Sequence, residues 1–231
     1  NINNSNPFVS TGDGSSLGVD LIENALTGGT SVTITTGSSG SEDGDISWNS
    51  GADLNYNGKG SASLKLDATR DISFLGKIYD SDTSNSDDSL AVTFNADKNK
   101  VGSGSISITG GEIETNGGDI TMNASNGLEV KTSSVIKSGG GDIQFNSTNG
   151  TIKIKGGSKI ESEAGKLELY GTSSTGDGIN LNGSNTKLTS SSGEIKIIGN
   201  STGTGYGVSI FVDEISSSGQ ISINGTSSQS R

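Results

Sequence analysis

Apolar residues alternate with polar ones in short runs along most of the chain, and the runs recur at a nearly constant distance. Runs that open on glycine and carry apolar residues at their third and fifth positions occur at 44–48, 118–122, 141–145, 165–169, 193–197 and 219–223. From residue 118 onward these runs begin 23, 24, 28 and 26 residues apart, and a similar run at 70–74 lies in the longer first gap. Alternation with a period of two predicts β-strands, and the recurrence predicts one structural repeat per period.

Each period holds two further apolar runs. The second lies at 127–130, 150–154, 178–181 and 207–210, and the third is a single apolar residue between polar ones, namely Ile113, Ile136, Ile160, Leu188 and Ile215. Three short strands per period are typical of a right-handed parallel β-helix, a β-solenoid in which each period forms one rung. We therefore predict an all-β fold of roughly eight rungs and a single domain over residues 1–231. Glycine and asparagine would occupy corners that need a positive φ.

One segment near the start of the chain has a helical pattern instead. Apolar residues stand there at the spacing of one helix face: Leu17, Leu21, Ala25 and Leu26. We predict a short helix at 19–27, which ends at the two glycines that follow and leads into a strand at 31–36. Such a helix would be suited to cover the end of a solenoid, where strand edges are otherwise open to pairing.

Residues 80–89 interrupt the repeat with acidic and small polar residues. The carboxylates of this segment belong to Asp80, Asp82, Asp87 and Asp88. The segment lacks the glycine and the ligand spacing of an EF-hand loop. We expect an exposed insertion that is available to a binding partner, and the sequence predicts no metal or other cofactor.

Composition and charge narrow the classes of partner. Only 28% of the 231 residues are hydrophobic, which alone would allow disorder, but their regular alternation favours a thin core along a rod. The net charge of −11 argues against nucleic acid and against anionic lipid as partners. No apolar run approaches the length of a membrane span, so we expect no membrane insertion. Because the chain begins with Asn1, we interpret it as a piece of a longer protein.

Polysaccharide lyases and hydrolases also adopt parallel β-helices, so an enzyme is the main alternative. Glycoside hydrolysis needs two positioned carboxylates. Asp45, Asp119 and Asp142 each follow a glycine at the start of a run, which favours a structural role. The chain has no histidine, and its only arginines are Arg70 and Arg231. We therefore predict a protein that is not an enzyme, with these aspartates as the residues to test.

Asn-x-Ser/Thr sequons provide candidate glycosylation sites. They stand at Asn3, Asn123, Asn146, Asn149, Asn182, Asn200 and Asn224. Composition alone predicts about six, so their number is not informative, whereas positions just past strand ends would accommodate a glycan.

Residues 21–78 resemble the filamentous-haemagglutinin type of bacterial two-partner-secretion exoprotein. The resemblance is carried by Ile22-Glu23-Asn24-Ala25-Leu26, by Gly29-Thr30-Ser31-Val32-Thr33, by Gly44-Asp45-Ile46, and by the stretch from Leu64 to Ile78. The abundance of asparagine is similar to that of the high-molecular-weight adhesins of this family, some of which are glycosylated on sequon asparagines. The later rungs are similar to the family's repeats more loosely.

The resemblance implies an internal piece of a large protein that is secreted to the bacterial cell surface through an outer-membrane transporter partner. The implied role is adhesion to a host-cell receptor or glycan, or to neighbouring bacteria. The stalk of a contact-dependent inhibition effector is a further alternative. No binding residue is implied by a motif.

Overall fold

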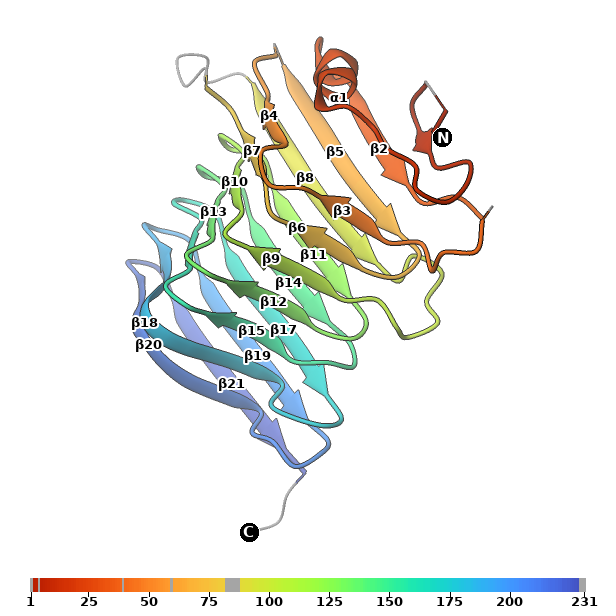
Figure 1. The fold of residues 1–231 in the computed structure, drawn as a ribbon. Coiled ribbons are helices and arrows are strands. Elements are labelled where there is room, and N and C mark those ends of the chain that lie inside the picture. Colours follow the sequence, from red (N-terminus) through yellow and green to blue (C-terminus); the bar gives the residue numbers. More distant parts are fainter. Residues whose placement is uncertain (1, 4, 39, 59, 82–87, 229–231) are drawn as a thin grey trace.

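The computed structural model describes residues 2–3, 5–38, 40–58, 60–81 and 88–228. The chain winds into a β-solenoid of about eight turns in which strands of successive turns lie parallel. Figure 1 shows the turns stacked in order from the N-terminal to the C-terminal end. The predicted all-β solenoid is confirmed, because alternating residues can bury one face of each strand only when neighbouring turns stack.

One side of the solenoid is a nine-stranded parallel sheet. Its strands, in spatial order, are β1 (Phe8–Val9), β2 (Ser31–Thr35), β5 (Ser61–Ala68), β8 (Ser89–Ala96), β11 (Ile120–Ala124), β14 (Ile143–Ser147), β17 (Leu167–Ser173), β19 (Ile195–Ser201) and β21 (Ile221–Ser227). Equivalent residues pair in register, as Val92, Ile120 and Ile143 do in three successive turns.

The other two sides belong to a twelve-stranded sheet. The second side holds β3 (Ile46–Trp48), β6 (Ile72–Phe74), β9 (Ile106–Thr109), β12 (Leu128–Lys131) and β15 (Ile152–Lys155), and the third holds β4 (Asp53–Asn55), β7 (Lys77–Tyr79), β10 (Glu112–Glu114), β13 (Val135–Lys137) and β16 (Lys159–Glu161). The long strand β18 (Ile179–Ser190) pairs with both β15 and β16, and β20 (Val208–Ser217) pairs with β18. In the turns near the C-terminal end, one long strand therefore forms both the second and the third side.

The sequence pattern groups the runs at 44–48 and 70–74 with the later glycine-opened runs, which lie on the first side of the solenoid, and this grouping is wrong. The runs at 44–48 and 70–74 form β3 and β6, which stack under β9 and β12 in the twelve-stranded sheet. Alternation looks the same on every side, so the local pattern cannot tell which side a strand occupies. The third ladder is confirmed, because Ile113, Ile136, Ile160, Leu188 and Ile215 pair in that order.

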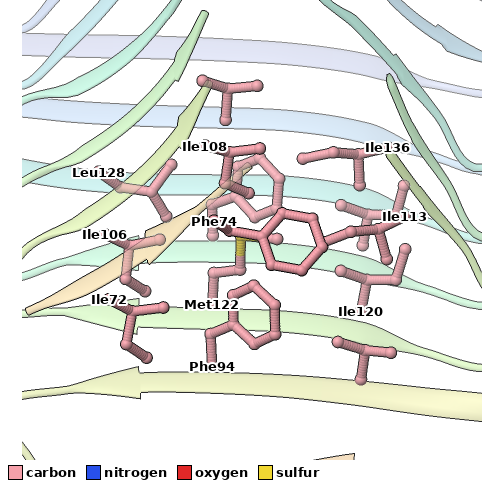
Figure 2. Close-up of a cluster of buried hydrophobic side chains, with 14 of the residues drawn as sticks. Ile72, Phe74, Phe94, Ile106, Ile108, Ile113, Ile120, Met122, Leu128 and Ile136 are labelled. Atoms are coloured by element: carbon pink, nitrogen blue, oxygen red, sulfur yellow. The ribbon is translucent and has the colours of Figure 1, made fainter. Parts of the chain in front are cut away.

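The core is a set of apolar columns that run along the axis of the solenoid. Figure 2 shows Ile72, Ile106 and Leu128 in one column and Phe94 with Met122 in another. All five are at most 2% exposed. Each turn contributes only a few apolar residues, and in the inner turns the inward-facing ones are covered by the turns above and below, which is how a chain with so few apolar residues keeps a continuous core.

Most glycines that open the recurring runs do not take a positive φ, although Gly44 does. Gly118, Gly141, Gly165 and Gly193 stack over one another, and all four lie outside the left-handed region. A Cβ atom on Gly165 would meet the backbone carbonyl of Gly141, so these positions need glycine because the neighbouring turn passes too close. The predicted positive φ is confirmed at other corner residues, such as Gly140.

The helix α1 (Val19–Leu26) is confirmed and lies at the N-terminal end of the solenoid. It contacts β2, β4 and β5 and buries Ile22 and Leu26, which are one helical turn apart. Leu21 is 47% exposed, so the buried side of the helix is centred on Ile22 and Leu26 and leaves out this one residue of the predicted apolar face.

Candidate binding face and the predicted site residues

A ladder of side-chain hydrogen bonds crosses the outer face of the nine-stranded sheet. Asn95 Nδ2 donates to Asp67 Oδ1 at 2.7 Å, and Asn123 Nδ2 donates to Asn95 Oδ1 at 2.8 Å. Asn146 Nδ2 continues the series by donating to Asn123 Oδ1 at 2.8 Å. The four residues occupy one register position in β5, β8, β11 and β14. In-register stacking thus turns four separate polar residues into one ordered surface.

The same outer face continues with a charged and aromatic group. Tyr170 pairs with Asn146 in the register, and its hydroxyl donates to Glu168 Oε1 at 2.8 Å. Lys196 Nζ lies 5.5 Å from the centre of the Tyr170 ring. Burial raises the pKa of Tyr170, and the hydrogen bond to Glu168 raises it further. This outer face, from Asp67 to Lys196, therefore offers amide, hydroxyl, aromatic and charged groups side by side.

The ladder was missed at the level of sequence, although a signal for it exists. Asn95, Asn123 and Asn146 each come directly after a large buried apolar residue of their strand. The triplets are Thr-Phe-Asn, Thr-Met-Asn and Gln-Phe-Asn. Aligning these triplets at equal register would have placed the asparagines in a column. We name the outer surface that runs from Asp67 through this column to Tyr170 and Lys196 the asparagine face.

The aspartates proposed as catalytic candidates bond to the backbone of the next turn. Asp119 Oδ1 accepts the amide of Asp142 at 2.9 Å, and Asp142 Oδ1 accepts the amide of Lys166 at 2.8 Å. Asp45 Oδ1 accepts the amide of Asp71 at 3.1 Å in the same way. Because Asp45 precedes a strand of the twelve-stranded sheet and the other two precede strands of the nine-stranded sheet, the structure does not bring the three together.

The Arg70 side chain is surrounded by carboxylates, one of which belongs to Asp45. Its Nε and Nη2 donate to the two carboxylate oxygens of Asp45 at 2.9 and 2.6 Å, and Nη1 contacts Asp43. Asp71 lies 3.3 Å from Arg70 Nε. The Arg70 guanidinium lowers the pKa of the Asp45 carboxyl through this hydrogen bonding. Asp45 is thus held as a charged partner of Arg70.

The expectation of exposed carboxylates in the insertion at 80–89 is wrong for two of the four. Asp80 is 7% exposed and Asp88 is 1% exposed, because both flank strands that are covered by neighbouring turns. Asn116 Nδ2 donates to Asp80 Oδ2 at 3.4 Å. Burial raises the pKa of Tyr56, and the charges of Asp88 and Asp80 raise it further. Asp82 and Asp87 lie outside the described residues.

The sequons differ in how free their side chains are. Asn123 and Asn146 use their amides in the ladder, and Asn200 Oδ1 accepts a hydrogen bond from Thr226 Oγ1 at 2.8 Å. The exposed sequon asparagines are Asn149, which follows β14, Asn182 in β18 and Asn224 in β21.

Comparisons with known proteins give no match to a family model, to a curated protein or to a solved structure. Within the described part of the chain, no helix has the length and apolar character needed to cross a membrane. Among the same residues, no three His, Cys, Asp or Glu side chains gather in a way that could hold a metal ion.

Proposed function

We propose that this chain is a structural and adhesive segment of a large secreted protein of the bacterial cell surface. The observation that carries the proposal is the unbroken parallel stacking of turns around one apolar core. Each turn is held to the next by backbone ladders and by side-chain bonds such as those of Asp119 and Asp142. Such a stack is stiff along its axis, which suits a segment that holds binding surface away from a cell.

The asparagine face is the surface that we expect to meet a host-cell receptor or glycan. It is polar and periodic, and it includes Tyr170 and Lys196 beside the column of amide groups. Contacts of this kind are individually weak and gain strength when many copies bind together. The resemblance of residues 21–78 to two-partner-secretion exoproteins supports export through an outer-membrane transporter partner.

The proposal is tested by displaying the chain at high density on beads and measuring retention on host cells and on arrays of neutral and acidic glycans. We expect retention that falls several-fold when Tyr170 and Lys196 are both replaced by alanine. A matched control replaces Lys153 and Lys155, which lie on the other sheet, and should leave retention unchanged. Beads that bind neither cells nor glycans would overturn the adhesive proposal, and cleavage of a glycan that is lost in Asp45→Asn or Asp142→Asn would favour an enzyme.

A further inference from the structure

A cavity of about 620 Å³ lies at the N-terminal end of the solenoid. Its walls come from the segment 10–17, from the end of β2 at 34–37 and from the stretch 41–49 that leads into β3. The volume falls in the range of small-molecule sites in proteins. The inference drawn from this cavity is independent of the adhesive role proposed above.

The cavity has an apolar floor because the helix covers only part of the first turn. α1 packs on β2, β4 and β5, and the β3 side of the turn is left to the segment 10–17. The apolar side chains that line the cavity are those of Ile2, Leu17, Ile22, Ile34, Ile46, Trp48 and Leu66. Ile34 and Ile46 are only partly buried, although the residues that stack on them in the next turn, Leu66 and Ile72, are at most 1% exposed. The floor is therefore apolar surface that a ligand could cover.

The segment over the cavity is held in place by hydrogen bonds to the opposite wall. Asp13 Oδ1 accepts the amides of Ser41 and Glu42 at 2.8 and 3.1 Å, and Asp13 Oδ2 accepts the Ser41 hydroxyl at 2.7 Å. Ser10 Oγ accepts the amide of Gly37 at 2.7 Å. These bonds close the wall without a ligand, so the cavity is largely formed in advance.

The rim of the cavity is acidic. Asp13, Glu42, Asp43 and Asp45 line it, and Arg70 is the cation among the lining residues. Arg70 is already engaged by Asp45 and Asp43. Among the described residues, no donor bonds to Oε1 of Glu42 or to Oδ1 of Asp43, although the second oxygen of each accepts a hydrogen bond. The rim therefore has negative charge and acceptor capacity that the protein does not use.

We propose that this cavity binds a small ligand with an apolar body and a cationic amine. The body would cover the floor around Trp48 and Ile46, and the amine would lie at the rim beside Glu42 and Asp43. The excess of carboxylates disfavours an anionic ligand of the same shape, since it would face like charges.

Trp48 makes the proposal directly testable, because it is the single tryptophan of the protein and it lines the cavity. The probes are 4-phenylbutylamine, 4-phenylbutanol and 4-phenylbutyrate, which share one apolar body and differ in charge. Each is titrated into the whole chain while tryptophan fluorescence is recorded. We expect saturable binding of the amine that is about tenfold tighter than that of the alcohol, and weaker still for the carboxylate.

The rim is tested by the double variant Glu42→Gln and Asp43→Asn, which keeps the shape of both side chains. It should weaken amine binding about tenfold and leave alcohol binding unchanged. The control is the double variant Glu161→Gln and Glu194→Gln, which removes the same charge from residues outside the cavity. Far-UV circular dichroism checks that both variants are folded.

Three results would overturn the proposal. Equal affinity for all three probes would show that the rim does not select an amine, and no saturable change with any of them would show that the cavity is not a ligand site. A loss of amine binding in the control variant equal to that in the rim variant would reduce the effect to net charge alone and would also overturn it.

Discussion

At the scale of single residues, many outward polar side chains bond to their counterparts in the next turn. The asparagine face and the backbone bonds of Asp119 and Asp142 are the clearest cases. These groups are partly exposed, so each bond contributes modestly to stability, but the contacts recur along the whole rod. Polar residues thus secure the stacking that the apolar core drives.

Replacing the central residue of the ladder should have a measurable cost. Asn123→Ala removes both a donor and an acceptor, and we expect it to lower the free energy of unfolding by about 1 kcal/mol. Urea denaturation followed by circular dichroism measures this change. Asn149→Ala, at an exposed position in the following turn, is the control and should stay within about 0.5 kcal/mol of the parent chain. Equal effects would show that the ladder adds nothing.

The Asp45–Arg70 pair predicts a pH dependence of stability. The folded pKa of Asp45 lies below its ordinary value of 3.8, so its contribution is present above that value and is lost as the pH falls through the folded pKa. Asp45→Asn should therefore be less stable than the parent at neutral pH, and the two should converge in acid. Thermal unfolding midpoints across a pH series measure the gap. A gap that stays constant in acid would mean that the charge of Asp45 is not the cause.

At the scale of elements, neighbouring turns approach so closely that only glycine fits at some positions just before the strands. The stacked glycines predict that Gly165→Ala is destabilising by about 1–3 kcal/mol or more, because its Cβ would collide with the Gly141 carbonyl. Gly12→Ala is the control, since a Cβ there meets nothing within 4 Å and its φ is not positive. Urea denaturation compares them. A neutral Gly165→Ala would mean that adjacent turns separate easily.

The end helix offers a second pair of matched substitutions. Leu26 is fully buried, so Leu26→Ala should cost about 2–5 kcal/mol of stability. Leu21→Ala, on the exposed side of the same helix, should cost well under about 1 kcal/mol. Unfolding by urea separates the two expectations, and similar losses would contradict the observed helix orientation.

The elements also show what sequence reasoning can and cannot reach. Alternation and a near-constant period were enough to predict a solenoid and the ladder through Ile136 and Ile160, because both follow from spacing along the chain. The side occupied by β3 and β6 was not predictable from alternation, which is identical on all sides. The asparagine column needs the triplets of successive turns to be aligned in register before it can be recognised. The burial of Asp88 depends on which residues meet between turns, and the cavity depends on incomplete coverage by α1.

At the scale of the whole molecule, the solenoid is nearly one-dimensional, because each turn packs mainly on the turns before and after it. Removal of one complete turn should therefore be tolerated. Deleting 118–140 joins Gly117 to Gly141 and would place Ile143 on Val92, where Ile120 now lies. We expect a folded chain with β-type circular dichroism and a cooperative melt. Deleting 118–130, which removes only part of a turn, is the control and should fail to fold. Equal behaviour of the two deletions would contradict the repeat.

The asparagine face also determines which sequons can be glycosylated before the chain folds and which can be glycosylated afterwards. Asn123 and Asn146 hold their amides in the ladder once the sheet has formed, whereas Asn149 and Asn182 remain exposed in the folded chain. An enzyme that attaches a sugar to the folded rod would find the second pair and not the first. A sugar on Asn123 or Asn146 would thus show that attachment preceded folding. The set of glycosylated sequons would therefore record whether the sugar was added before or after the solenoid formed.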